Sequence, residues 1–174
     1  KGRSGMSTRD EDFVAQVFVV NTHTPVLFFS SAGIVYKLKV YKLPLGSPTA
    51  RGKAMINLLP LKEGETISTL MALPEDEETW GDLNILFATA KGKVRRNLLS
   101  DFGNVKANGK IAMKFENGDA DDRLIKARTF SENDDVLLAT RDGKCIRFPV
   151  DDLRVFNSRS STGVRGIKLA DGDE

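Results

Sequence analysis

Lysine and arginine side chains offer the clearest chemistry in this sequence of 174 residues, because cations at regular intervals can bind phosphates. The net charge is only +2, but the bases are not spread evenly. They concentrate in residues 1–56, 91–114 and 136–168, and acidic stretches separate these three regions. A basic pattern that recurs three times favours a polyanion with repeating charge, and bent duplex DNA fits that description.

We expect the basic side chains to contact phosphates and to position DNA without reading its bases. The candidate DNA-binding residues are Lys1, Arg3, Lys37, Lys39, Lys42, Arg51, Lys53, Lys91, Lys93, Arg95, Arg96, Arg141, Lys144, Arg147 and Arg165. Strand alternation predicts that Lys93 and Arg95 share one exposed face, with Val94 on the other. A solvated surface and an anionic lipid site are the other interpretations, and no amphipathic helix accompanies the bases to favour lipid.

The residue types that support catalysis do not form a recognised site. The segment GSPTARGKA resembles a phosphate-binding loop, but five residues separate Gly46 from Gly52 instead of four, and Ala54 replaces the required Ser or Thr. The single histidine, His23, and the single cysteine, Cys145, leave little for a metal site or a nucleophilic triad. We therefore predict no catalytic residue, no metal site and no cofactor in this chain.

The composition is ordinary for a globular protein, with 40% hydrophobic and 29% charged residues. No apolar run approaches the roughly 18 residues of a membrane span. The opening KGRSGMSTRDED also lacks the apolar stretch of a secretory signal. These features predict a protein of the cytoplasm without a membrane partner.

Three motifs recur in the same order, which predicts a repeat protein. The first is an apolar run, a glycine turn and a mixed run, in VLFFSSAGIVYK, ILFATAKGKVRR and VLLATRDGKCIR. Their turn glycines, Gly33, Gly92 and Gly143, lie 59 and then 51 residues apart. A glycine motif follows each time, in RGKAMINL, NGKIAMKF and TGVRGIKL, and then LKEGE, FENGD or LADGD.

Each repeat indicates β-structure, because short β-rich runs are bounded by glycine turns that suit hairpins. About four strands in each unit is the size of a propeller blade, so we predict an all-β fold of blades about an axis. A repeating sandwich is the alternative. The expected units are residues 13–65, 66–119 and 120–174, preceded by a linker segment at 1–12.

The segment KVYKLPLGSPTARGKAMINLLPLKEGE, residues 39–65, resembles the C-terminal domain of the DNA gyrase A subunits, as does STGVRGIKLADGD at 161–173. The opening KGRSGM resembles the end of that family's basic, glycine-rich box, of which Lys1 and Gly2 remain. The resemblance covers essentially the whole chain. It implies a β-pinwheel, a propeller-like ring of six blades that exchange outer strands, of which this sequence would be half.

The resemblance also implies a function. The domain would bind double-stranded DNA and wrap it around a basic rim, supporting ATP-dependent negative supercoiling without catalysis of its own. The catalytic tyrosine and the sites for ATP and magnesium would lie outside this chain. The implied partners are the B subunit of gyrase and a second A subunit, in a heterotetramer on the bacterial nucleoid, with no membrane and no small-molecule substrate.

Two other identities stay open. The A subunit of topoisomerase IV has a related domain without a well-formed box, so KGRSGM favours gyrase. A protein-interaction propeller with incidental surface charge is disfavoured by the recurrence of the bases. Because three units would leave open sheet edges, we also expect the chain to dimerise or to exchange strands.

Overall fold

The computed structural model describes residues 13–115, 121–159 and 161–174, and it consists of β-strands joined by short 3-10 helices. The strands are β1 (Pro25–Ser30), β2 (Ile34–Lys39), β3 (Ile67–Ala72), β4 (Asn84–Thr89), β5 (Lys93–Leu98), β6 (Lys110–Ile111), β7 (Leu124–Phe130), β8 (Asp135–Ala139), β9 (Cys145–Pro149) and β10 (Val164–Arg165). The 3-10 helices are η1 (Val40–Lys42), η2 (Met55–Asn57), η3 (Glu77–Asp82), η4 (Leu99–Phe102) and η6 (Val150–Asp152). The predicted all-β class is confirmed.

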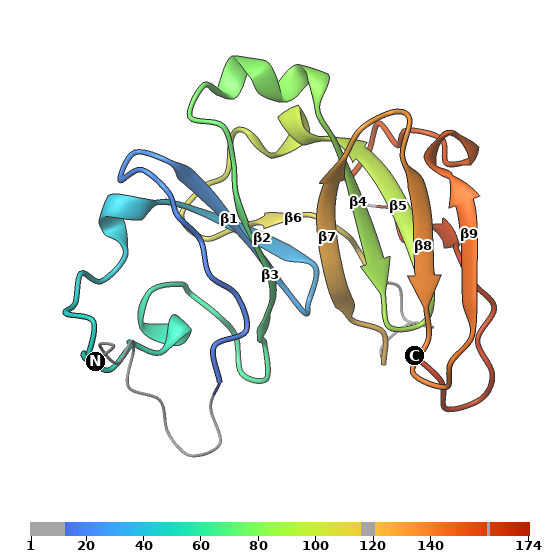
Figure 1. Cartoon of the computed structure of the whole chain (residues 1–174), viewed down its shortest axis with the longest axis horizontal. Helices are drawn as coiled ribbons and strands as arrows, with labels where there is room; N and C mark the ends of the chain where they lie inside the picture. The colour runs from blue at the N-terminus through green and yellow to red at the C-terminus, as the bar shows by residue number, and fades with distance from the viewer. Residues whose placement is uncertain (1–12, 116–120, 160) are drawn as a thin grey trace, which may run out of the picture.

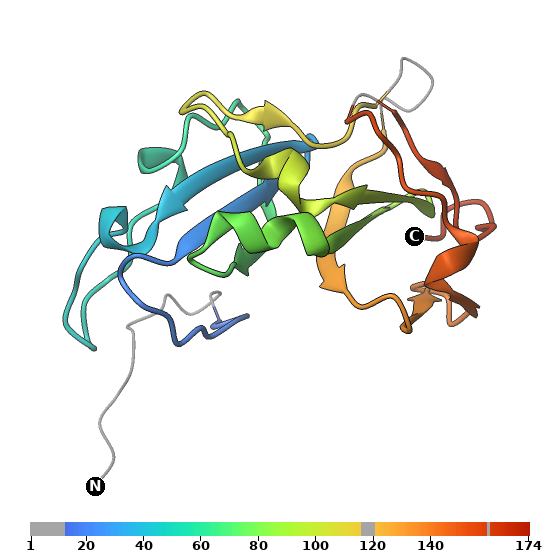
Figure 2. The same cartoon turned by 90° about the horizontal axis from the view of Figure 1, so that it is seen from above.

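Three antiparallel sheets follow one another across the molecule, from β1–β3 at the left of Figure 1 to β8 and β9 at the right. Figure 2 shows the same succession from above. The strand orders are β3-β1-β2-β6, β10-β5-β4-β7 and β8-β9. Strand β6 comes from the second glycine motif but joins the first sheet, and β10 comes from the third motif but joins the second sheet. Neighbouring units therefore exchange strands, while the predicted unit boundaries stay a prediction.

Each predicted hairpin turn forms with glycine at the position that needs a positive φ. The φ angles are +75° at Gly33, +75° at Gly92 and +87° at Gly143. In each turn the hydroxyl three residues before the glycine accepts a hydrogen bond from the amide that follows the glycine, at 3.2, 3.2 and 3.1 Å. A Ser or Thr before a glycine turn thus satisfies one backbone donor in all three units.

The first two turns are also the points where the next unit attaches. The Gly33 carbonyl accepts hydrogen bonds from the amides of Ala112 and Met113 at 2.8 and 3.0 Å. The Gly92 carbonyl accepts the two equivalent bonds from the third unit, at 2.8 and 3.2 Å. A Cβ on Gly92 would lie 2.7 Å from the carbonyl oxygen of Ile167, so the backbones meet too closely for a side chain.

This contact predicts different costs for two equivalent substitutions. Gly143→Ala should cost about 1–2 kcal/mol, since only the positive φ is unfavourable and no atom lies within 4 Å of the added Cβ. Gly92→Ala should cost clearly more, because the added Cβ also displaces the backbone that supplies two hydrogen bonds. Urea unfolding of the two variants measures the difference. Equal losses of stability would contradict the role of Gly92 as an attachment point.

The apolar side chains fill three layers. Phe29, Phe87 and Phe102 pack edge to face between the first two sheets, with ring centroids 5.4, 6.1 and 5.6 Å apart. A second layer, around Val94 and Val136, lies between the second sheet and β8–β9. A third covers the outer face of the first sheet. The second sheet is therefore buried on both faces, and strand alternation along β5 cannot leave one face in water.

Tyr36 lies in the outer layer, where it gives the stability a dependence on pH. Its hydroxyl donates to Oε1 of Glu65 at 3.0 Å, and burial, this hydrogen bond and the carboxylate charge raise its pKa to about 12. The unfolded pKa is about 10, so the unfolded chain loses this proton first as the pH rises. The free energy of unfolding should fall between pH about 10 and about 12. Tyr36→Phe should show a smaller fall in urea titrations, and an identical fall would contradict the assignment.

Among the described residues, no helix has the length and apolar character needed to cross a membrane. In the same part of the chain, no group of three or more His, Cys, Asp or Glu side chains is placed to hold a metal ion.

Candidate nucleic-acid interface

Strand exchange brings basic residues of two units into one groove. The groove lies where β10 and the residues after it cross the β4–β5 turn, and its lining includes Lys91, Lys93, Arg165 and Lys168. Arg165 stands directly opposite Lys93 in the β10–β5 register. Lys91, Arg165 and Lys168 are exposed, and Lys93 is half-buried. We call these four residues the basic groove.

The close approach of the two backbones depends on a residue without a side chain. A Cβ on Gly166 would lie 2.7 Å from Cδ1 of Leu138 and 2.8 Å from Cγ1 of Val94. Because Gly166 has no side chain, the chain after β10 can pack against both Val94 of β5 and Leu138 of the third hairpin. The glycine at position 166 thus allows the third glycine motif to place Arg165 and Lys168 in the groove.

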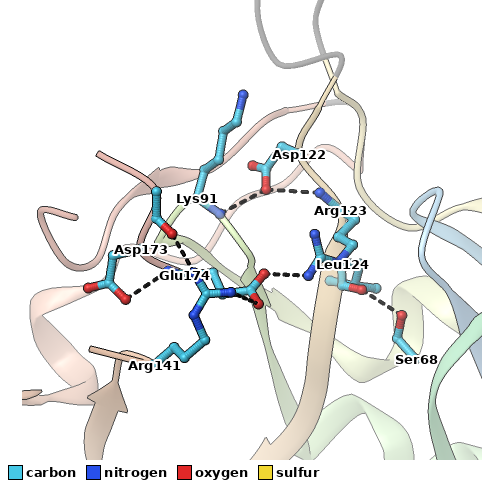
Figure 3. Close-up of polar contacts among 9 residues, drawn as sticks. Ser68, Lys91, Asp122, Arg123, Leu124, Arg141, Asp173 and Glu174 are labelled. Atoms are coloured by element: carbon cyan, nitrogen blue, oxygen red, sulfur yellow. Dashed lines mark hydrogen bonds and ion pairs between the residues drawn. The ribbon is translucent and has the colours of Figure 1, made fainter. Parts of the chain in front are cut away.

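A buried carboxylate holds the turn that presents Lys91. Oδ1 of Asp122 accepts hydrogen bonds from the amides of Lys91 and Arg123, both at 2.9 Å. Figure 3 shows that the Lys91 side chain extends away from this carboxylate. The backbone of the turn is fixed by Asp122 while the ammonium group is left at the surface.

Asp173 holds the third turn in the same way, because its Oδ1 accepts a hydrogen bond from the Asp142 amide at 3.0 Å. The same oxygen accepts from the Glu174 amide at 2.8 Å (Figure 3). Desolvation would raise the pKa of Asp173, but hydrogen bonds from the Thr140 side chain and the two amides, with the charge of Arg141, lower the pKa below its usual value. Asp171 and Asp173 line the same depression as the four basic residues, so one end of this depression is acidic.

Arg95 is fully buried, which corrects the prediction that it shares an exposed face with Lys93. Its guanidinium donates to Oδ1 of Asn97 at 2.7 Å and to the carbonyls of Arg159 and Ser161 at 2.8 and 2.6 Å. It also donates to the carbonyl of Ala112 and lies over the Phe87 ring. Burial lowers the pKa of Arg95 to about 10; the negative charge of Asp101 opposes this shift, and the positive charge of Arg159 adds to it. Arg95 joins residues of the second and third units and is fully buried, so it has no surface to offer a phosphate.

Lys37 and Arg96 occupy equivalent positions in consecutive units, and each side chain reaches into the next unit. Lys37 Nζ lies 2.8 Å from Oε1 of Glu77 and 2.5 Å from the carbonyl of Gly103. Arg96 is buried and lies 3.3 Å from Oδ1 of Asp151. Lys37 and Arg96 are predicted phosphate contacts, but in the structure their side chains bind residues of the next unit.

This chain matches one known family along almost its whole length. The family model described as "DNA gyrase C-terminal domain, beta-propeller" matches residues 1–21, 24–74, 83–131 and 134–174. The chain belongs to this family.

The relatives of this gyrase-family domain are much longer proteins. The DNA gyrase A subunit of Rickettsia bellii is 55% identical over 99% of this chain and 19% of its own length. The DNA gyrase A subunit of Staphylococcus aureus is 42% identical over 100% of this chain and again 19% of its own length. The domain thus spans about a fifth of the curated relatives it matches, and these names favour gyrase over topoisomerase IV.

Solved structures confirm the propeller-like fold. A DNA gyrase A C-terminal domain matches with a TM-score of 0.69 and 26% identity, over 98% of this chain and 53% of its own. The C-terminal domain of a DNA topoisomerase IV matches with a TM-score of 0.82 at 21% identity, over 96% of this chain and 50% of its own. The second likeness supports the fold alone.

The remaining predicted contacts of the gyrase-family domain lie outside the basic groove. Lys39 and Lys42 line a separate groove beside β2. Arg51 and Lys53, further along the chain, are exposed. On the third unit Lys144 is exposed, Arg147 lies 3.4 Å from Asp135, and Arg141 lies 3.0 Å from Glu174. Lys1 and Arg3 fall outside the described residues. These side chains stay predicted phosphate contacts without a common site.

Sequence reasoning missed Lys168. It is the seventh residue of TGVRGIKL and corresponds to Lys114 in NGKIAMKF, so the repeated motif held the signal. The predicted contacts lie mainly in the hairpins and at the starts of the glycine motifs, ahead of this position. Only the crossing of β10 over the second turn shows that the end of the motif also reaches the basic groove.

Proposed function

We propose that this gyrase-family domain binds duplex DNA on its exposed basic residues and bends it, as the DNA-wrapping part of a DNA gyrase A subunit. The observation that carries the proposal is the basic groove, in which strand exchange places exposed cations of two units side by side. Phosphates recur along the duplex, so cations at unit junctions suit contacts to the backbone rather than to the bases.

A rigid array of sheets suits the bending of DNA. Bending 20–30 base pairs by 40–90° costs on the order of 1–6 kcal/mol, so several phosphate contacts must act together. Extended strands and two buried layers between the sheets hold the cations in fixed positions. The energy of the phosphate contacts can then deform the duplex instead of the protein.

In this proposal the domain has no catalytic step of its own. It positions DNA for the topoisomerase, while ATP and magnesium act elsewhere in a heterotetramer that contains the gyrase B subunits and a second A subunit. The resulting activity is negative supercoiling in the bacterial cytoplasm, on the nucleoid. The family membership supports this larger role, and the surface cations support its DNA-binding part.

Salt titration tests the binding step. If the four residues of the basic groove each neutralise a phosphate, the slope of log K against log salt should be about −3.6 or steeper, from −0.9 for each contact. Affinity should depend little on base sequence. Fluorescence anisotropy with duplexes of unrelated sequence measures both quantities. A flat salt dependence, or a strong preference for one short sequence, would contradict the proposal.

Plasmid topology tests the bending step separately. A nicked plasmid is saturated with the domain, ligated and stripped of protein, and its linking number is compared with that of a plasmid ligated alone. Wrapping predicts a shift in the linking-number distribution. Salt-sensitive binding without such a shift would reduce the proposal to a DNA-binding role, and absence of binding would favour a protein-interaction propeller.

A further inference from the structure

Two arginines outside the lining of the basic groove converge on one carboxylate, where the second sheet meets the third. Nη2 of Arg123 donates to Oε2 of Glu174, and Nη1 of Arg141 donates to Oε1 of the same carboxylate at 3.0 Å. Figure 3 shows the Glu174 carboxylate between the two side chains. Arg123 directly precedes β7 of the second sheet, and Arg141 lies in the turn between β8 and β9, so neighbouring sheets supply the pair.

The backbone that carries Glu174 is held by a contact that recurs in every repeat. The amide two residues before each turn glycine donates to a carbonyl further along the chain. The pairs are Ser31 with Thr66, Ala90 with Arg123 and Arg141 with Glu174, at 2.7, 2.9 and 2.7 Å. The position of Glu174 beside Arg141 therefore follows from the repeat, and it does not depend on the Glu174 side chain.

The arginine pair adjoins the basic groove. Oδ1 of Asp122 accepts hydrogen bonds from the amides of both Lys91 and Arg123, so these two exposed residues are neighbours. The Arg141 guanidinium also donates to the carbonyl of Gly172, which lines the groove. A duplex that lies on Lys91 therefore passes close to the pair.

The two guanidinium groups are arranged as they would be around a phosphate, with a carboxylate in its place. Arginine binds carboxylate and phosphate oxygens through the same planar set of donors. The side chains of Arg123, Arg141 and Glu174 are 52%, 59% and 36% exposed, so a ligand can reach all three. Ion pairs as exposed as these are weak, so a phosphate that is also held by nearby cations can displace the carboxylate.

We propose that Arg123 and Arg141 bind one phosphate of the DNA backbone, in a site that Glu174 occupies until DNA displaces it. The inference rests on the proposed function, because its ligand is the duplex assigned to the basic groove. Arg123 is then a DNA contact in addition to the predicted ones, and Glu174 is a competitor that limits the affinity for DNA.

Glu174→Gln tests the competition. Duplex affinity at low salt should rise about twofold to thirtyfold, because two exposed ion pairs no longer have to be broken, and each contributes a factor of about 1.4 to 5. The matched control is Glu132→Gln, which makes the same change of charge at an exposed glutamate after β7. Fluorescence anisotropy measures both variants. No gain for Glu174→Gln, or an equal gain for Glu132→Gln, would overturn the proposal.

Arg123→Gln, made with and without Glu174→Gln, tests the site itself. With Glu174→Gln present it should weaken binding about fivefold, since the arginine then meets phosphate without a competitor. In the native background it should cost about twofold or less, because the phosphate must first replace Glu174. Arg128→Gln, at an exposed arginine of β7, should cost the same in both backgrounds. Equal costs for Arg123→Gln in both backgrounds, or a weakening that only follows a lower melting temperature, would overturn the proposal.

The native domain separates this inference from the function on which it rests. Absence of salt-sensitive duplex binding by the native domain would overturn both. Salt-sensitive native binding, together with an affinity that Glu174→Gln leaves unchanged, would overturn the arginine site alone and leave the basic groove in place.

Discussion

Reversing the charge of Lys91, Arg165 and Lys168 to glutamate should weaken duplex binding at least about a hundredfold at low salt. Each side chain is exposed and lines the basic groove, so the variant loses three cations and gains three anions facing phosphate. A surface charge pair contributes about 1 kcal/mol at 4 Å in water, and three such losses reach about two orders of magnitude in affinity. Anisotropy at low salt measures the change, and the melting temperature should move little because exposed side chains carry little packing.

The control for this variant has the same change in net charge at other places. Lys62→Glu, Lys106→Glu and Arg128→Glu reverse two lysines and one arginine that are exposed and lie outside the groove lining. Lys93 is left unchanged because it is half-buried. If both triple variants lose the same affinity, overall charge governs binding and the groove has no special role. A large fall in melting temperature would show that the groove residues are structural.

Arg95→Met should lower the free energy of unfolding by about 3–5 kcal/mol, the second large effect. The substitution removes donors from the carbonyls of Arg159, Ser161 and Ala112, and from Oδ1 of Asn97. Each buried acceptor left without a partner costs about 1–3 kcal/mol, and methionine supplies only part of the lost volume. Urea unfolding and calorimetry should both show the loss, with a melting temperature lower by about 10 °C or more.

Arg128→Met provides the comparison, because it makes the same chemical change at an exposed position of β7. Its free energy of unfolding should stay within about 0.5 kcal/mol of the native value. If Arg95→Met instead melted at the native temperature and bound DNA more weakly, Arg95 would be a phosphate contact, as strand alternation alone had predicted. The two readouts therefore separate a residue that joins units from a residue that binds DNA.

The sequence by itself determined the parts of this protein that depend on neighbours along the chain. Short apolar runs with a glycine between them specify the hairpins, because Gly33, Gly92 and Gly143 adopt a positive φ that other residues resist. The recurrence of three motifs specified the repeat and the all-β class. The concentration of lysine and arginine in three regions identified the parts of the chain from which the basic groove is built.

Only the tertiary structure decided which of those cations reach the surface. Lys91, Lys93, Arg95 and Arg96 follow one another in a single basic stretch, yet Arg95 and Arg96 are buried and Lys91 is exposed. The difference arises because β10, from the third unit, covers one edge of β5, while packed layers cover both of its faces. Strand alternation reports only that successive side chains point to opposite faces. Whether a face meets water or another sheet depends on segments distant in the sequence, and their positions are set by strand exchange.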